Sequence, residues 1–287
     1  MRTNGRAHEF SGKVAVITGA GSGIARSLAV ALARHGASLA ISDIDTAGLK
    51  ETARLCEASG TAVKADYLDV ADPAAMRAYA GDVYGLFGRI NQLYNIAGIA
   101  YFGEIEKEPL EDMRRILDVN FWGTVCGTQA FLPHLIESGD GHIINMSSLF
   151  GLVTFPGQSA YSVSKFAVRG FSDTLRQEML ATHREVRVTC VYPGGIKTGI
   201  ARNMRVAEGL DAAAIAGIFD RRLALHGPDM AAAAILAGVR ARKARVVVGA
   251  EAKALDWLSR ITPTGAQRFG LFFSRSLGLV AAPRSAA

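Results

Sequence analysis

Short apolar runs alternate with amphipathic segments along most of the chain. The runs are rich in β-branched residues and cover 13–20, 38–43, 62–70, 90–98, 141–148, 186–194 and 244–250. Their length and composition indicate buried strands. Between them, apolar residues recur with helical spacing in 23–36, 45–59, 72–88, 109–137, 158–182 and 229–243. Asp72 and Pro73 fit the N-cap and first position of the third helix. Strands that alternate with helices predict an α/β fold, a doubly wound parallel sheet with helices on both faces.

The pattern continues without an internal repeat, a low-complexity segment or a convincing linker. The chain has 287 residues, a length compatible with one large α/β domain. We therefore predict one Rossmann-type domain over 10–250 and a C-terminal extension over 251–287. Ligands of such sheets bind beyond the carboxyl ends of the strands.

Charge and cysteine content exclude several classes of protein. The formal net charge is +6, and the clearest basic cluster, "RARKAR" at Arg240–Arg245, is typical of a helix C-terminus. We therefore expect no nucleic-acid partner. Cys56, Cys126 and Cys190 are widely spaced and odd in number, which favours free thiols and a cytoplasmic location. We expect no signal peptide, no transmembrane segment and no metal site, because the necessary apolar runs and ligand clusters are missing from the sequence.

A glycine-rich loop, "TGAGSGIA" at Thr18–Ala25, joins the first strand to the first helix. Its glycines permit a tight turn and a close approach of the backbone to a pyrophosphate, and the helix N-terminus favours the negative charge. A plain strand-to-helix turn is the alternative. Asp43 ends the second strand, 20 residues after Gly23. Its carboxylate can accept both hydroxyls of the adenosine ribose, although it could instead cap the next helix.

The neighbours of these residues bear on the choice of cofactor. Ser22 precedes Gly23 and Ile44 follows Asp43, and neither supplies a cation for a 2′-phosphate. The sequence therefore favours NAD over NADP.

Tyr161 and Lys165 lie four positions apart within the helical segment 158–182. Residues with this spacing share one face of a helix, so a phenol and an ammonium point the same way. On its own, a tyrosine four residues before a lysine is typical of ordinary packing. Beside a dinucleotide-binding loop, the tyrosine can act as a general acid or base whose pKa is shifted by the lysine cation.

Together these residues resemble the classical short-chain dehydrogenase/reductase (SDR) family over roughly 10–250. Thr18, Gly19 and Gly23 match its glycine motif, whose last glycine is Ala25 here, and we expect the extra methyl to fit with a small shift. Asn95, Ala97 and Gly98 match its N-N-A-G motif, with Ile96 in place of the second asparagine. In the family this motif steadies the sheet beside the adenosine.

The resemblance implies the roles of individual residues. The implied catalytic residues are Asn120, Ser148, Tyr161 and Lys165, with Ser148 at the family spacing of 13 residues before the tyrosine. The implied NAD-binding residues are Gly19, Ser22, Gly23, Ile24, Asp43, Ile44, Asp69, Val70, Asn95, Ala97, Gly98, Tyr161, Lys165, Pro193, Gly194, Ile196 and Thr198.

These roles imply hydride transfer between an alcohol carbon and the nicotinamide, with Tyr161 as general acid or base. We expect the Lys165 cation, helped by the positive charge of the nicotinamide, to lower the pKa of the phenol, and we expect Lys165 to bind the nicotinamide ribose. Ser148 would donate a hydrogen bond to the substrate oxygen. Asn120 would hold a water molecule that relays protons from Lys165.

Substrate specificity is less clearly encoded. Candidate wall residues are Tyr101, Phe102, Val153, Phe155, Gln158 and Gly195, and the segment from about 199 to 226 is the expected lid. Its apolar residues Ile200, Met204, Leu210, Ile215 and Ile218 suggest a hydrophobic ligand, or simply helices that pack on the domain. Lys197, Arg202 and Arg205 could contact an acidic substrate or remain solvated.

The extension mixes arginines with Phe269, Phe272, Phe273, Leu277 and Leu279. This pattern suits a cover for the domain, a peripheral membrane contact or a subunit contact. The resemblance also implies a homo-oligomer, a tetramer or dimer, with the helices that bear Asn120 and Tyr161 at one interface.

The leading hypothesis is an NAD-dependent dehydrogenase that interconverts a hydrophobic secondary alcohol and its ketone. The alternatives are an NADP-dependent carbonyl reductase or epimerase, and a non-catalytic NAD-binding scaffold.

Overall fold

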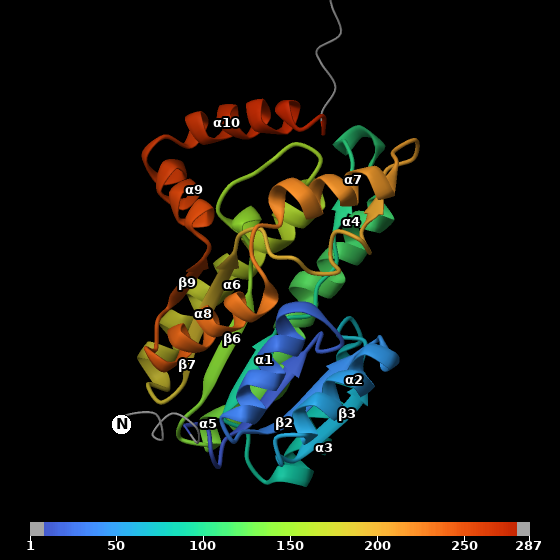
Figure 1. Cartoon of the computed structure of the whole chain (residues 1–287). Helices are drawn as coiled ribbons and strands as arrows, with labels where there is room; N and C mark the ends of the chain where they lie inside the picture. Colours follow the sequence, from blue (N-terminus) through green and yellow to red (C-terminus); the bar gives the residue numbers. More distant parts are fainter. Residues whose placement is uncertain (1–8, 280–287) are drawn as a thin grey trace, which may run out of the picture.

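A seven-stranded parallel sheet forms the centre of the computed structural model, which describes residues 9–279 (Figure 1). Its strands are β1 (Val14–Thr18), β2 (Ser38–Asp43), β3 (Val63–Tyr67), β4 (Gln92–Asn95), β6 (His142–Met146), β7 (Arg187–Pro193) and β9 (Arg245–Val248). They lie in the order β3-β2-β1-β4-β6-β7-β9, so the order reverses between β1 and β4. A crevice forms at such a reversal, beyond the carboxyl ends of the strands. All seven predicted strands are confirmed.

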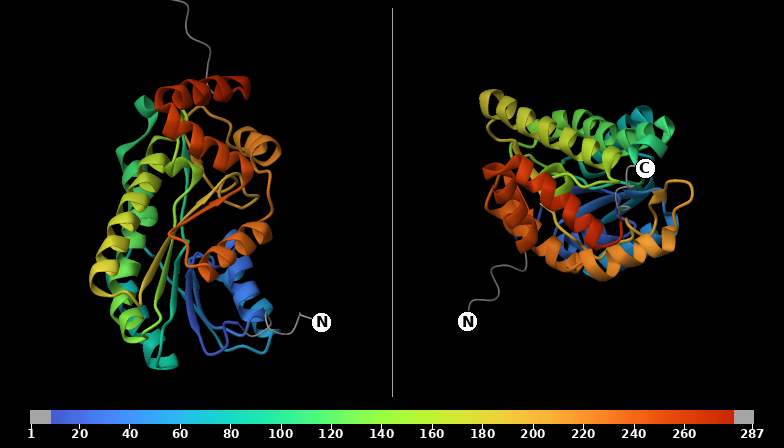
Figure 2. Two further views of the ribbon diagram at one scale, coloured as in Figure 1. Left: turned by 90° about the vertical axis from the view of Figure 1, so that its left-hand side faces the viewer. Right: turned by 90° about the horizontal axis from the view of Figure 1, so that it is seen from above.

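Helices cover both faces of this sheet, as the edge view in Figure 2 shows. On one face α1 (Gly23–Arg34) packs against α2 (Thr46–Glu57) and α8 (Pro228–Arg240). On the other lie α3 (Pro73–Phe87), α5 (Gly123–Glu137) and α6 (Ser159–Thr182). Each face has its own apolar cluster, and Ala25 is 1% exposed within the first, so the methyl in place of the family's glycine is accommodated there. The predicted doubly wound fold is confirmed.

One predicted helix is interrupted at a candidate catalytic residue. The segment 109–137 contains α4 (Leu110–Leu117), a π-helical turn (Asp118–Trp122) and α5. Asn120 lies in this turn and is fully buried. A π turn widens the helix by one residue and is common at functional sites, yet it leaves the apolar period nearly intact. Periodicity therefore predicted one continuous helix.

A ladder of buried polar side chains crosses from β4 through β6 to α6. The Asn95 amide donates to Asn145 Oδ1 at 2.9 Å and to Thr128 Oγ1 at 3.2 Å. The Asn145 amide in turn donates to Ser172 Oγ at 3.0 Å. These bonds fix the strand ends beside the crevice, because each buried amide needs a partner.

Two helices of the C-terminal extension lie over the carboxyl ends of the strands, where α10 crosses the top of the molecule (Figure 1). They are α9 (Ala250–Ile261) and α10 (Pro263–Ser276). Arg245 of β9 donates to Asp256 of α9 at 3.1 Å. The buried stripe of α10 is Ala266, Gly270 and Ser274. The extension therefore covers the domain, while 280–287 lie outside the described residues.

A two-stranded parallel sheet joins the segment after β4 to the lid. It consists of β5 (Tyr101–Phe102) and β8 (Arg205–Val206), and it was not predicted. All three cysteines are free. Among residues 9–279, no helix has the length and apolar character needed to cross a bilayer.

Gly270 is expected to be required for docking of α10. A Cβ atom there would lie 3.0 Å from the Thr154 carbonyl oxygen, so Gly270→Leu would force the helix outward at a cost of about 1–3 kcal/mol. Trypsin should then cleave after Arg268 and Arg275 faster than in wild type. The exposed control Gln267→Leu should leave cleavage unchanged, and equal rates for both variants would contradict the docking described here.

Candidate active site

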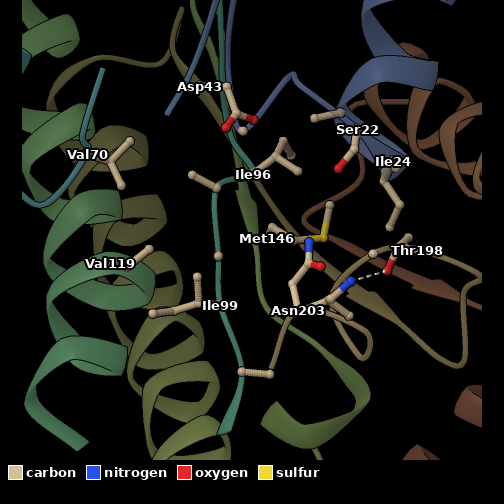
Figure 3. A pocket seen from close by; sticks show the side chains of 18 of the residues that line it. Ser22, Ile24, Asp43, Val70, Ile96, Ile99, Val119, Met146, Thr198 and Asn203 are labelled. Atoms are coloured by element: carbon tan, nitrogen blue, oxygen red, sulfur yellow. Dashed lines mark hydrogen bonds between the residues drawn. The ribbon is translucent and has the colours of Figure 1, made fainter. Parts of the chain in front are cut away.

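A cavity of about 900 Å³ occupies the crevice beyond β1, β2, β4 and β7. Every predicted cofactor-binding residue lines it except Asn95, which is buried beneath it in the polar ladder. Figure 3 shows Ser22 and Asp43 at one end, with Met146 and Thr198 toward the other. Sequence reasoning missed further lining residues, among them Glu111, Arg114, Arg115, Met146 and Asn203, which carry no motif.

The glycine-rich loop has the backbone that its sequence suggested. Gly19 and Gly23 have φ angles of 71° and 56°, in the left-handed region that other residues avoid. A Cβ atom on Gly19 would lie 2.7 Å from Ala97 Cα, so the loop touches the segment after β4. The Ser22 side chain does not cap α1, which leaves the first amides of this helix facing the cavity. Such amides bind anions such as phosphate.

Asp43 is bonded to the same loop. Its Oδ2 accepts the Gly21 amide proton at 2.7 Å, and its Oδ1 accepts that of Asp45 at 2.9 Å. The cap of α2 is Asp45, which accepts from Gly48 N, so the alternative role of Asp43 as helix cap is wrong. The Asp43 carboxylate is therefore held in a fixed orientation at the cavity wall.

The four candidate catalytic residues converge from three elements. Lys165 is 2% exposed and donates from Nζ to the Met146 carbonyl at 3.1 Å, while its Nζ lies 5.5 Å from the centre of the Tyr161 ring. Ser148 follows β6, and its Oγ accepts the Phe150 amide proton at 3.2 Å. Asn120 bonds through its side chain to both backbone groups of Ile99, at 2.8 and 3.0 Å.

Gly98 lies where these elements meet. A Cβ atom there would be 3.1 Å from Asn120 Oδ1 and 3.4 Å from Lys165 Nζ. The glycine lets the chain after β4 pass between the π-helical turn and α6. Asn120 itself lines neither large cavity, so it positions its neighbours within the protein alone.

Burial controls the proton affinities at this site. It raises the pKa of Tyr161 to about 12, and the nearby Ser148 hydroxyl acts weakly in the opposite direction. It lowers the pKa of Lys165 to about 8. In the protein alone desolvation of the phenolate is the larger effect, and the lowering expected from Lys165 together with the nicotinamide charge stays a prediction.

A second cavity, of about 520 Å³, adjoins the first and has mostly apolar walls. Of the predicted substrate wall, Phe102, Phe155, Gln158, Gly195, Ile200 and Met204 line it. Tyr101 and Val153 do not, because each is buried in a small apolar cluster of its own. The extension supplies a roof that was not predicted, with Leu255, Leu258, Phe269, Phe273, Leu277 and Leu279. Local apolar spacing identifies such a helix but not the surface on which it docks.

The lid uses its other residues for packing and surface ion pairs. Ile215 packs with Phe102 and Met204. The cations suggested for an acidic substrate are engaged elsewhere, since Arg202 pairs with Asp220 at 3.1 Å and Arg205 with Asp112 at 2.5 Å. Lys197 lines neither large cavity.

Ser148 and Tyr161 line both cavities, together with Gly194, Ile196 and Thr198. An occupant of the larger cavity and an occupant of the smaller one would therefore meet at the Ser148 and Tyr161 hydroxyls. The sequence pattern of the short-chain dehydrogenases matches residues 13–209. This chain belongs to the short-chain dehydrogenase family.

Relatives within the family match most of the chain. SadH of Mycobacterium tuberculosis, named as an oxidoreductase, is 60% identical over 90% of this chain and 94% of its own. Dehydrogenase/reductase SDR family member 7B of Xenopus tropicalis is 33% identical over 91% of this chain and 83% of its own.

A solved short-chain dehydrogenase/reductase from Burkholderia phymatum, in complex with NAD, superposes with a TM-score of 0.82. It is 27% identical and covers 90% of this chain and 96% of its own. The family pattern ends at residue 209, so the second half of the lid and the α9–α10 roof lie beyond it. Within residues 9–279, no cluster of His, Cys, Asp or Glu could hold a metal ion.

In the cofactor-free protein, a substitution that removes the buried Lys165 ammonium should increase stability. With a pKa of about 8 when folded and 10.5 ordinarily, this lysine destabilises the fold by about 3 kcal/mol below pH 8. Between pH 8 and pH 10.5 the unfolded chain keeps the Lys165 proton and the folded protein has lost it, so the free energy of unfolding rises with pH. Lys165→Met should therefore raise Tm most near pH 7, and the gain should shrink toward pH 10.

The matched control is Lys50→Met, which removes an exposed ammonium and should leave Tm nearly unchanged. A Tm for Lys165→Met below that of wild type at pH 7 would contradict the desolvation described here.

Proposed function

We propose that this short-chain dehydrogenase uses NAD to interconvert a hydrophobic secondary alcohol and its ketone. The observation that carries the proposal is the position of Ser148 and Tyr161 on the boundary between the larger cavity, which the glycine-rich loop lines, and the apolar one. Hydride transfer requires the cofactor ring and the substrate carbon to meet at such a boundary, next to a proton donor.

The larger cavity fits a dinucleotide with free ribose hydroxyls. The uncapped start of α1 suits the pyrophosphate, and Asp43 suits the hydroxyls of the adenosine ribose while it repels a 2′-phosphate. Arg26, a nearby cation, is committed to Thr52 Oγ1 at 2.8 Å and to the Gly48 carbonyl at 3.0 Å. The similar Burkholderia phymatum protein binds NAD, which agrees with this assignment.

Proton transfer would run through Tyr161. A phenol with a pKa near 12 keeps its proton at neutral pH and can donate it to a carbonyl oxygen. In the alcohol direction the phenol must lose that proton, which the Lys165 cation and the positive charge of the oxidised nicotinamide favour. Ser148 would hold the substrate oxygen. The cofactor, when bound, accepts or donates the hydride.

The walls of the smaller cavity favour an apolar substrate. Phe102, Phe155, Met204, Phe273 and Leu277 come from four separate segments and surround the space next to Tyr161. A volume of about 520 Å³ falls within the range of small-molecule sites. Substrates with many polar groups would lose hydration against these apolar walls and gain few partners in return.

Assembly and location extend the proposal. Trp122, Val163 and Phe166 are 52%, 50% and 37% exposed on the helical segments next to Asn120 and Tyr161. This apolar surface supports the homo-oligomer implied by the family, with these helices at an interface. The free cysteines support a cytoplasmic location.

Loss of the Tyr161 hydroxyl should abolish chemistry and preserve cofactor binding. In Tyr161→Phe, turnover of any alcohol substrate should fall by at least about 1,000-fold, since no other acid adjoins both cavities in the described residues. The thermal shift produced by NAD should remain within about 1 °C of wild type. The exposed control Tyr67→Phe should keep full activity, and substantial turnover by Tyr161→Phe would refute the assignment.

Asp43 should set the preference for NAD. Asp43→Ala removes the charge that repels a 2′-phosphate, so the KM for NADP should fall at least about 10-fold while that for NAD rises. Asp82→Ala, which removes an exposed carboxylate on α3, is the control. Equal use of NADP and NAD by wild type would contradict the assignment and would point to Arg114 and Arg115, which also line the cavity.

A further inference from the structure

The apolar cavity contains a buried amide without a protein partner. Gln158 is 4% exposed and lines the cavity three residues before Tyr161. Its side chain makes no hydrogen bond to any residue in 9–279. Neither atom of its amide is among the fully buried atoms without a partner, so the amide is accessible from the cavity and its hydrogen-bonding groups are available for a ligand.

The backbone holds Gln158 firmly at this place. Its carbonyl accepts the Ser162 amide proton at 2.8 Å at the start of α6, and it forms a parallel bridge with Gly103. Gly157 precedes it with a φ of 78°, and its carbonyl accepts from Gly103 N at 3.0 Å. The backbone of Gln158 is thereby fixed at the start of the helix that carries Tyr161, which limits the positions that its amide can reach.

Of the other polar groups on the cavity wall, Asp220 and one oxygen of Glu251 are paired, whereas the side chains of Arg222 and Ser274 form no hydrogen bond or ion pair within residues 9–279. Asp220 pairs with Arg202 at 3.1 Å, and Glu251 Oε2 contacts His226 Nε2 at 3.0 Å. The remaining Glu251 oxygen, Oε1, is buried next to Gly194 without a hydrogen-bond partner, but it belongs to a carboxylate and can only accept. Ser274 of α10 is 3% exposed and lines the opposite, roof side. Gln158 is therefore the one amide side chain on this wall within residues 9–279, and it lies three residues before Tyr161.

We propose that Gln158 recognises a second, uncharged oxygen on the substrate, a hydroxyl or carbonyl close to the reacting carbon. The inference rests on the proposed function and narrows its substrate class to apolar compounds with two neighbouring oxygens. A neutral amide both donates and accepts, so it suits an alcohol or a ketone equally. The apolar remainder of the substrate extends beneath α10, along the wall that Phe155 and Phe273 form together.

The experiment compares 2-dodecanol with 2,3- and 2,4-dodecanediol as substrates, using NAD and the full chain. Wild type should show a kcat/KM at least about 10-fold higher for one diol than for 2-dodecanol. Gln158→Met keeps the side-chain length and removes the amide, so this ratio should fall at least 10-fold. Gln158→Asn should recover part of it. In Ser274→Ala the ratio should stay as in wild type.

Three results would overturn the inference. They are a wild-type ratio near one, a ratio that Gln158→Met leaves unchanged, and a ratio that depends on Ser274 instead. Gln158→Met could lower kcat/KM by the same factor for 2-dodecanol and for the diol. The ratio would then be unchanged, and this result too would overturn the inference.

A binding measurement separates this inference from the proposed function. The thermal shift of the NAD-loaded protein is recorded with each alcohol for wild type and Gln158→Met. A diol-specific shift that the variant lacks, without turnover of any alcohol, would keep Gln158 as a binding residue and refute the dehydrogenase proposal. Turnover of 2-dodecanol without any preference for a diol would refute only the role of Gln158.

Discussion

The enclosure of the Lys165 ammonium is the interaction on which the site depends. It is 2% exposed, and its Nζ has the Met146 carbonyl as hydrogen-bond partner. Three elements must meet to enclose it: the end of β6, the segment after β4 and the π-helical turn at Asn120. A buried cation without a neighbouring negative charge destabilises the cofactor-free protein. Such a cost in stability is typical of a site arranged for a ligand. Gly98 and the Asn120 side chain bring these elements together.

The parallel sheet then determines what surrounds this lysine. Parallel strands direct all their carboxyl ends to one edge, so the loops after β1, β2, β4, β6 and β7 share one crevice. Tyr161 lies one helical turn from Lys165 and forms part of the boundary with the apolar cavity. The roof of that cavity comes from α9 and α10, and a row of ring contacts runs from Tyr161 through Phe150 and Phe155 to Phe273. The apolar cavity is thus completed by residues beyond the family pattern.

Local signals predicted the strands, most helices and the dinucleotide loop. Gly19, Gly23 and Asp43 act within one strand–helix–strand unit, where the order of residues nearly fixes their spatial relation. The π turn at Asn120 escaped prediction because a single extra residue barely shifts helical periodicity. The raised pKa of Tyr161 in the protein alone was not predicted, because it comes from desolvation, which arises from the packing of distant segments. The docking of α10 on Phe155 is likewise a long-range contact that periodicity cannot locate.

The central claim is that a nicotinamide in the larger cavity meets an alcohol carbon in the smaller one at Ser148 and Tyr161. The direct measurement is a single turnover with NAD and a hydrophobic secondary alcohol deuterated at the carbinol carbon, followed by mass spectrometry of the nicotinamide product. The account predicts one deuterium in the NADH formed and none when the label is supplied only by the solvent. Absence of NADH across a panel of such alcohols, or label that derives from solvent, would contradict it.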